Sequence, residues 1–197
     1  GLQKNDPKNS QFYEQGLKKL EARLDESLFG EKLPRILGGD LLGRLAEKGK
    51  LIPFLERKKY QGKPLIEKLG GWMKKMLPIR GIPIVTYHEN WIYFIALFGL
   101  EQVGTVEPRP GIPPSPRHRA KLTKKMKSEG VKILLSANYF NQNLARAQAR
   151  QVGAEAVIVP LYVGGAEGTE DYFALVEYWI NSILAAAKRQ GIIAKEQ

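Results

Sequence analysis

The chain has 197 residues, of which 43% are hydrophobic, enough to bury a substantial core. No uninterrupted apolar stretch approaches the roughly 20 residues that a helix needs to cross a bilayer, so the sequence excludes a membrane-spanning segment of that kind. There are no cysteines, which excludes disulfides, thiolate metal sites and cysteine nucleophiles and leaves histidine, carboxylates and water as metal ligands.

The net charge is +11, from 31 Lys plus Arg against 20 Asp plus Glu. Such a charge favours approach to polyanions such as nucleic acid or anionic lipid head groups. Aromatic residues are not interleaved with the basic ones as they are in single-strand binders, so we expect no nucleic-acid partner. We expect the basic residues to be spread over several solvated helix faces, among them Lys18, Lys19, Lys74, Lys75, Lys124 and Lys125.

The first part of the chain is rich in lysine and predicts helices. Asp6-Pro7 is typical of a cap followed by Pro at the first helical position, and apolar residues then recur at helical spacing until Gly30. This pattern predicts a long helix within residues 1–30. Over residues 31–80, prolines and paired glycines break the apolar clusters, which predicts short helices joined by turns. Because the chain opens at Gly1 with no basic and apolar leader, we expect that a signal peptide or upstream domain was removed or left out.

Residues 81–197 alternate between β-rich and helical segments. Ser115 and Pro116 are typical of a helix cap and first turn. Four strands that alternate with four helices imply right-handed βαβ crossovers. The predicted fold class is therefore α/β: a Rossmann-like lobe with a four-stranded parallel sheet flanked by helices, preceded by the long helix and the short helices. The predicted strands cover residues 82–87, 102–106, 131–137 and 156–161, and the predicted helices cover 91–98, 115–128, 142–151 and 172–188.

Candidate binding residues follow the predicted strands, because ligands of open parallel sheets sit outside the carboxyl ends of the strands. His88 comes directly after the first strand, which places an imidazole at that edge. The alternative is a histidine at a helix entry that bonds to nearby backbone. Glu170 and Asp171 bring carboxylates to the same edge before the last helix, although acids behind a Thr cap also simply complement the helix macrodipole.

Two loops of this half have special composition. The glycines within residues 164–168 suggest a phosphate cradle, but their spacing matches neither the dinucleotide fingerprint nor the P-loop. The segment 107–118 is dense in proline and predicts a rigid strand-to-helix connection with His118 exposed on the first helical turn. No nucleophile elbow and no metalloprotease helix motif occurs, so we expect a binding protein rather than an enzyme.

Several separated motifs resemble, in order, the zinc and manganese substrate-binding proteins of ABC importers. They are VTYHENWIYF at residues 85–94, FGL at 98–100, EP at 107–108 and PPSP at 113–116. The DPKN and FY of residues 6–13 resemble the start of the helix that joins the two lobes in that family. The resemblance extends from Asp6 to about Leu184, while residues 33–77 have no clear family counterpart.

The resemblance implies a carboxy-terminal lobe that supplies two ligands to one zinc or manganese ion held between two lobes. His88 takes the position of the first ligand, and Glu170, or Asp171 one residue later, that of the second. It also implies that an amino-terminal lobe is missing, that the partner is the membrane permease of an ABC importer, and that the protein is periplasmic or extracytoplasmic. Two ligands alone would bind zinc weakly. Imidazole mildly favours zinc over manganese.

Two other functions stay open at this point. The first is a doubly wound nucleotide- or phosphate-binding protein that uses the loop at residues 164–168. The second is a polyanion-binding protein that exploits the positive charge.

Overall fold

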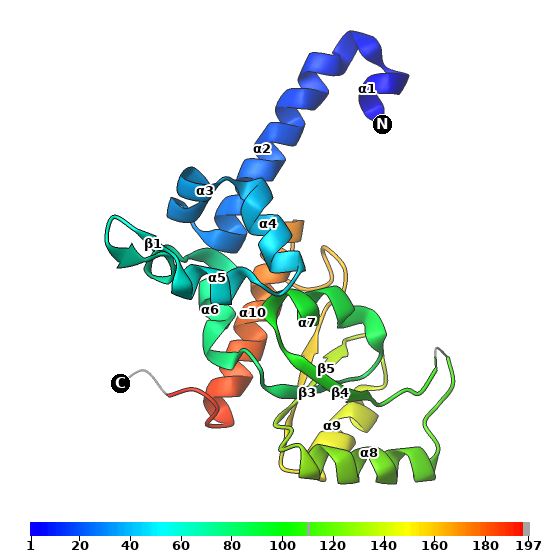
Figure 1. Cartoon of the computed structure of the whole chain (residues 1–197). Coiled ribbons are helices and arrows are strands. Elements are labelled where there is room, and N and C mark those ends of the chain that lie inside the picture. The colour runs from blue at the N-terminus through cyan, green and yellow to red at the C-terminus, as the bar shows by residue number, and fades with distance from the viewer. Residues whose placement is uncertain (110, 195–197) are drawn as a thin grey trace. The chain divides into compact units, whose positions relative to one another are not determined.

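The computed structural model describes residues 1–109 and 111–194 (Figure 1). The chain divides into two compact units, residues 1–75 and residues 76–197. The division of the sequence into domains at residues 1–30, 31–80 and 81–197 remains a prediction, because compactness alone does not test which segments fold independently.

The first unit is helical, as the sequence predicts. Helices α3 (Lys32–Leu37) and α4 (Gly39–Glu47) both contact the long helix α2 (Ser10–Phe29). Phe29, Leu33 and Leu42 are almost completely buried there. The remaining elements are α1 (Leu2–Asn5), η1 (Pro7–Asn9), α5 (Leu51–Arg57), β1 (Lys59–Tyr60), β2 (Lys63–Pro64), η2 (Leu65–Lys68) and α6 (Gly71–Met76).

Two local features of this unit differ from the sequence prediction. The long helix begins at Ser10, because Asp6-Pro7 starts a separate 3-10 turn and the Asp6 carboxylate accepts hydrogen bonds from Asn9 Nδ2 (2.8 Å) and Tyr13 Oη (2.9 Å). Strands β1 and β2 form a small antiparallel hairpin that was not predicted. Its two turn residues, Gln61 and Gly62, both have positive φ, as the tight turns of hairpins require.

Glycines allow a close backbone approach between the end of α2 and the start of α6. The Gly70 N–H donates a hydrogen bond to the Phe29 carbonyl at 2.8 Å. A Cβ at Gly71 would lie 2.3 Å from the Ser27 carbonyl oxygen, and its φ of +58° is in the left-handed region. Any side chain at this position would therefore force these segments apart.

The second unit contains a four-stranded parallel sheet with the strand order β4-β3-β5-β6. This result confirms the predicted fold class, and the element boundaries agree with the predicted ones to within two residues. The strands are β3 (Pro83–Thr86), β4 (Glu101–Thr105), β5 (Ile133–Ala137) and β6 (Glu155–Val159). The helices are α7 (Ile92–Phe98), α8 (Pro116–Ser128), α9 (Gln142–Arg150) and α10 (Tyr172–Arg189), with short 3-10 turns η3 (Leu77–Ile79) and η4 (Glu89–Trp91).

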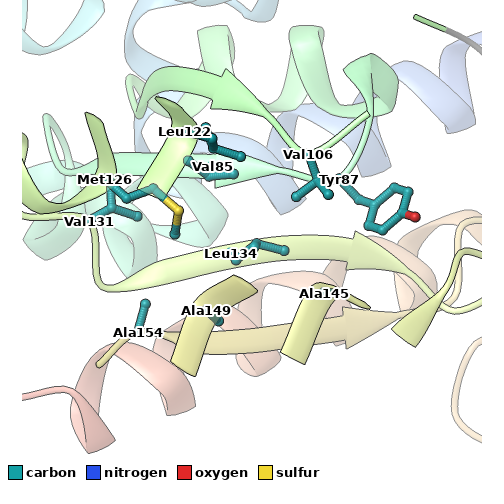
Figure 2. Packing of buried hydrophobic residues seen from close by; sticks show 10 residues of the cluster. All are labelled: Val85, Tyr87, Val106, Leu122, Met126, Val131, Leu134, Ala145, Ala149 and Ala154. Carbon is teal, nitrogen blue, oxygen red and sulfur yellow. The ribbon is translucent and has the colours of Figure 1, made fainter. Parts of the chain in front are cut away.

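Helices cover both faces of this sheet. On one face, α8 and α9 pack over β3 and β5 through a cluster of buried apolar residues (Figure 2). On the other, α10 contacts β5 and β6, and its Trp179 ring lies 4.9 Å from that of Trp91 and 5.9 Å from that of Phe94 in α7. The ten residues of the first cluster shown in Figure 2 are Val85, Tyr87, Val106, Leu122, Met126, Val131, Leu134, Ala145, Ala149 and Ala154.

The strand order places a topological switch point between β3 and β5. From β3 the chain crosses to β4 on one side, and from β4 it returns over β3 to β5 and then to β6 on the other. The connections that leave β3 and β5 therefore diverge, and ligands of open parallel sheets bind at the carboxyl ends of strands with this arrangement. A ligand site is therefore expected at this edge of the sheet.

Candidate metal centre

His88 lies at the switch point, two residues after the last residue of the central strand β3. Its backbone is extended (φ −141°, ψ 174°) and it precedes the turn η4. The Glu107 N–H donates a hydrogen bond to the Tyr87 carbonyl at 2.9 Å, which extends the β3–β4 pairing past the strand ends. This bond brings Glu107 alongside His88.

The side chains of these two residues meet at the edge of the sheet. His88 Nδ1 lies 3.4 Å from Glu107 Oε2, and both side chains are largely buried, with exposed fractions of 21% and 12%. The Nδ1 atom is itself buried and makes no hydrogen bond, so Glu107 is the acidic group beside it at 3.4 Å. Within the described residues, the ring makes no hydrogen bond to backbone, which is not the arrangement of a histidine that serves a helix entry.

Aromatic rings form one wall beside the pair. The Phe140 ring stacks on Tyr87 at 4.6 Å between centroids and meets the His88 ring edge-on at 6.0 Å. Burial raises the pKa of the Tyr87 phenol, and the negative charge of Glu107 raises it further. Tyr87 therefore stays a neutral phenol at physiological pH and adds no charge to the site.

Glu170 and Asp171, the other candidate ligands, are both engaged within their own loop and helix. Asp171 Oδ1 accepts a hydrogen bond from the Ala174 N–H at 2.8 Å and caps α10. Glu170 Oε1 accepts one from the Gly168 N–H at 2.8 Å. The cap of α10 is thus Asp171, whereas the sequence suggested Thr169, whose hydroxyl instead bonds to Ala166.

The structure does not bring all three candidate ligands together. Among the residues it describes, no group of three His, Cys, Asp or Glu side chains is arranged to hold a metal ion. The residue set His88, Glu170 and Asp171 therefore stays a prediction.

The glycine loop after β6 does not have the form of a phosphate cradle. The Gly164 N–H donates to the Thr169 carbonyl, the Gly165 N–H to the Tyr162 carbonyl, and the Gly168 N–H to Glu170. Phosphate cradles depend on several backbone N–H groups that point at the ligand. Because the amides of all three glycines donate to acceptors within the loop, they do not point at a common ligand.

His118 is also placed differently from the prediction. It is half-buried rather than exposed, and its Nε2 lies 3.0 Å from the Thr105 carbonyl oxygen on the edge strand β4. Its N–H donates to Ser115 Oγ at 3.2 Å, which confirms Ser115 as the cap of α8. His118 therefore joins α8 to the sheet.

Glu107 is the site residue that sequence reasoning missed. It follows the predicted strand 102–106 just as His88 follows 82–87, so the same rule about strand ends applied to both. Its place at the head of a proline-dense segment suggested only a rigid connection. The strand-end rule placed both residues at the same edge of the sheet, but only the strand order shows that β3 and β4 are neighbours.

The second unit is thus a doubly wound parallel sheet with an imidazole and a carboxylate side by side at its switch point. The chain belongs to the family described as "ZnuA: Zinc-uptake complex component A periplasmic", whose model matches residues 58–186. This membership confirms the resemblance seen in the sequence. No curated protein matches the chain.

Solved structures share the fold. One is a ZnuA, with 17% identity and a TM-score of 0.52; the match covers 96% of this chain and 53% of the ZnuA chain. The laminin-binding protein Lbp of Streptococcus pyogenes has 20% identity and a TM-score of 0.54, with 92% of this chain and 56% of Lbp covered. FpvC of Pseudomonas aeruginosa in complex with Mn²⁺ has 20% identity and a TM-score of 0.54, with 96% of this chain and 57% of FpvC covered. The chain therefore spans about half the length of these proteins. Among the described residues, no helix combines the length and the apolar character required to cross a membrane.

Proposed function

We propose that the chain forms the metal-binding lobe of an extracytoplasmic substrate-binding protein that captures a divalent metal ion, with zinc favoured over manganese, for an ABC importer. The single observation that carries the proposal is the His88–Glu107 pair at the switch point of the sheet, with 3.4 Å between Nδ1 and Oε2. The metal ion here is cargo, which the lobe must hold and then release.

The pair has the chemistry of a metal-binding histidine and its supporting carboxylate. Histidines that bind metals usually turn their second ring nitrogen toward a carboxylate, which fixes the tautomer and makes the ligating nitrogen more basic. With Nδ1 only 3.4 Å from Glu107 Oε2, a small rotation of the ring would let Nδ1 donate to this carboxylate and leave Nε2 for the ion. We infer that His88 is a ligand and that Glu107 orients it.

Glu170 is the better candidate for the second ligand. Asp171 caps α10, and loss of such a cap typically costs about 1 kcal/mol. Glu170 is exposed and accepts a hydrogen bond from the neighbouring Gly168 amide, which a small rearrangement of the loop would exchange for a metal ion. Asp171 remains the alternative one residue away.

The rest of the coordination shell has to come from elsewhere. Zinc typically takes about four ligands, and two from one lobe leave the others to water or to a second lobe. The chain covers only 53–57% of the solved structures described above, which leaves room for a second lobe in proteins of this kind. We therefore propose that this lobe alone binds zinc weakly and that a second lobe completes the site.

The compartment and the partner follow from the family. Its description as a periplasmic zinc-uptake component supports a periplasmic or extracytoplasmic location and delivery of the ion to a membrane permease. Neither catalysis nor nucleic-acid binding is part of the proposal.

Calorimetric titration of zinc into the chain tests the proposal, because the sequence has only two histidines and each can be replaced separately. We expect weak one-site binding that His88→Ala reduces by at least about tenfold and His118→Gln leaves unchanged. Thermal unfolding checks that both variants are folded. Unaltered affinity in His88→Ala would contradict the assignment, and so would a comparable loss in His118→Gln.

A further inference from the structure

The positive charge of the second unit is concentrated in one segment. Residues 108–154 contain ten basic residues and a single acidic one, Glu129, so this segment has a net charge of +9. The rest of the unit, residues 76–107 and 155–197, has four basic and nine acidic residues, a net charge of −5. The ten basic residues are Arg109, Arg117, Arg119, Lys121, Lys124, Lys125, Lys127, Lys132, Arg146 and Arg150.

Helix α8 turns its basic residues outward. Leu122 and Met126 of this helix are buried in the core, whereas five of its basic residues are exposed. Figure 2 shows both apolar side chains directed into the cluster beneath the helix. The exposed residues are Arg117, Lys121, Lys124, Lys125 and Lys127.

Helix α9 continues the same surface. Ala145 and Ala149 are buried against the sheet, while Arg146 and Arg150 are exposed. The two helices lie side by side (Figure 1), joined by hydrogen bonds of 2.7 Å from Thr123 Oγ1 to Gln151 Oε1 and from Gln148 Nε2 to Thr123 Oγ1. Helices α8 and α9 thus carry seven exposed basic side chains over the same face of the sheet, and these seven residues are called the basic face.

Within the described part of the lobe these charges are not neutralised by ion pairs. Arg146 Nη2 donates a hydrogen bond to Gln142 Oε1 at 3.3 Å, and Lys125, Lys127 and Arg150 lie in the last turns of their helices, where they gain from the helix dipole. None of the ion pairs among the described residues involves a side chain of the basic face. Arg117 and Lys121, and Lys121 and Lys125, are like charges four residues apart on one helix, a spacing that destabilises helices. Cations that form no ion pair among the described residues are suited to an external anionic surface.

We propose that the basic face docks on an anionic phospholipid bilayer. About four to eight clustered Lys and Arg residues are typical of proteins that bind anionic lipids electrostatically. The exposed large hydrophobic residues of the chain all lie outside α8 and α9 within the described residues, so the face binds on the surface and does not insert. It also has no exposed aromatic ring on which a nucleic-acid base could stack.

Docking through this face leaves the candidate metal centre accessible. The basic face covers one broad side of the sheet, whereas His88 and Glu107 lie at its carboxyl edge. The lobe therefore has one positive side for the bilayer and a separate edge with carboxylates for a cation. The lipid proposal stands on the charge distribution and does not depend on the metal proposal.

Co-sedimentation of the whole chain with vesicles tests the proposal. The probes are vesicles of phosphatidylcholine with about 30% phosphatidylglycerol, vesicles of phosphatidylcholine alone, and duplex DNA. We expect binding to the anionic vesicles only, weakened at about 0.5 M NaCl because salt screens exposed charges. Binding to neutral vesicles to the same extent, or tighter binding to duplex DNA at equal salt, overturns the proposal.

A matched pair of variants separates the basic face from net charge. The triple variant Lys121→Glu, Lys124→Glu, Lys125→Glu should weaken vesicle binding at least about tenfold. The control Lys4→Glu, Lys8→Glu, Lys19→Glu makes the same change of net charge at exposed positions of the first unit and should change binding less than about twofold. Equal losses in the two variants contradict the assignment to α8 and α9, as does unchanged binding of the first; circular dichroism verifies that both are folded.

Discussion

At the scale of residues, the account rests on the contact between His88 and Glu107. The sequence predicted the position of the histidine, because an imidazole directly after a buried parallel strand has to lie at the carboxyl edge of the sheet. It did not reveal the partner of the ring. A contact between the ends of two strands depends on which strands are neighbours, and the alternation of strands and helices leaves that order open.

Replacing Glu107 tests the orienting role. Glu107→Gln keeps the size of the side chain but removes the charge that faces Nδ1, and loss of such a supporting carboxylate typically lowers metal affinity by about 10- to 100-fold. Glu101→Gln is the matched control, because Glu101 is exposed at the start of β4, the strand that precedes Glu107; it should have no effect. Zinc calorimetry on both measures the difference, and equal affinities would remove Glu107 from the site.

The second ligand can be identified with substitutions that preserve the fold. Asp171→Asn retains a good helix cap, since Asn and Asp are nearly equivalent at this position, but removes the negative charge. We expect Asp171→Asn to leave zinc affinity nearly unchanged and Glu170→Gln to reduce it about tenfold or more. The reverse pattern in the same titrations would make Asp171 the ligand.

At the scale of elements, periodicity predicted the strands and helices of the second unit well and the turns of the first unit less well. Buried parallel strands such as β5 are continuous apolar runs, which are easy to detect. The hairpin of β1 and β2 has only two residues in each strand, too few to give a pattern. An Asp-Pro pair is compatible with the start of either a long helix or a 3-10 turn, so the sequence did not show which one Asp6-Pro7 begins.

The close approach of α2 and α6 predicts that alanine at Gly71 destabilises the first unit. Gly71→Ala should destabilise the first unit by more than about 1 kcal/mol, because φ is positive there and a Cβ would collide with backbone. Gly43→Ala is the control: Gly43 lies inside α4 with open space around its Cα, so alanine should stabilise by up to about 1 kcal/mol. Urea unfolding of both variants measures the two opposite effects.

At the scale of the whole molecule, the charge is distributed differently from what composition suggests. The sequence predicted solvated basic residues on many helices, and the total of +11 fits that picture. Only the packing of α8 and α9 on one face of the sheet shows that seven exposed cations share one surface in the second unit. Carboxylates such as Glu107 lie at the carboxyl edge of the sheet in the same unit, apart from the helix faces that carry the seven cations.

Family membership and fold were predictable at this scale because separated motifs appear in a fixed order. The motif that includes His88 and the proline-dense segment that begins at Glu107 both fall within the residues that the family model matches. The complete metal site was not predictable from one lobe. A coordination shell shared between lobes requires residues from both, and each lobe's sequence specifies only its own part.

The most direct test of the central claim is an NMR titration of the two imidazole rings with zinc. The sequence contains only His88 and His118, so their ring nitrogens can be assigned by one substitution. We predict that zinc shifts the Nε2 resonance of His88, with its proton retained on Nδ1 toward Glu107, and leaves His118 unaffected. Zinc that shifts only His118, or neither ring, would contradict the account.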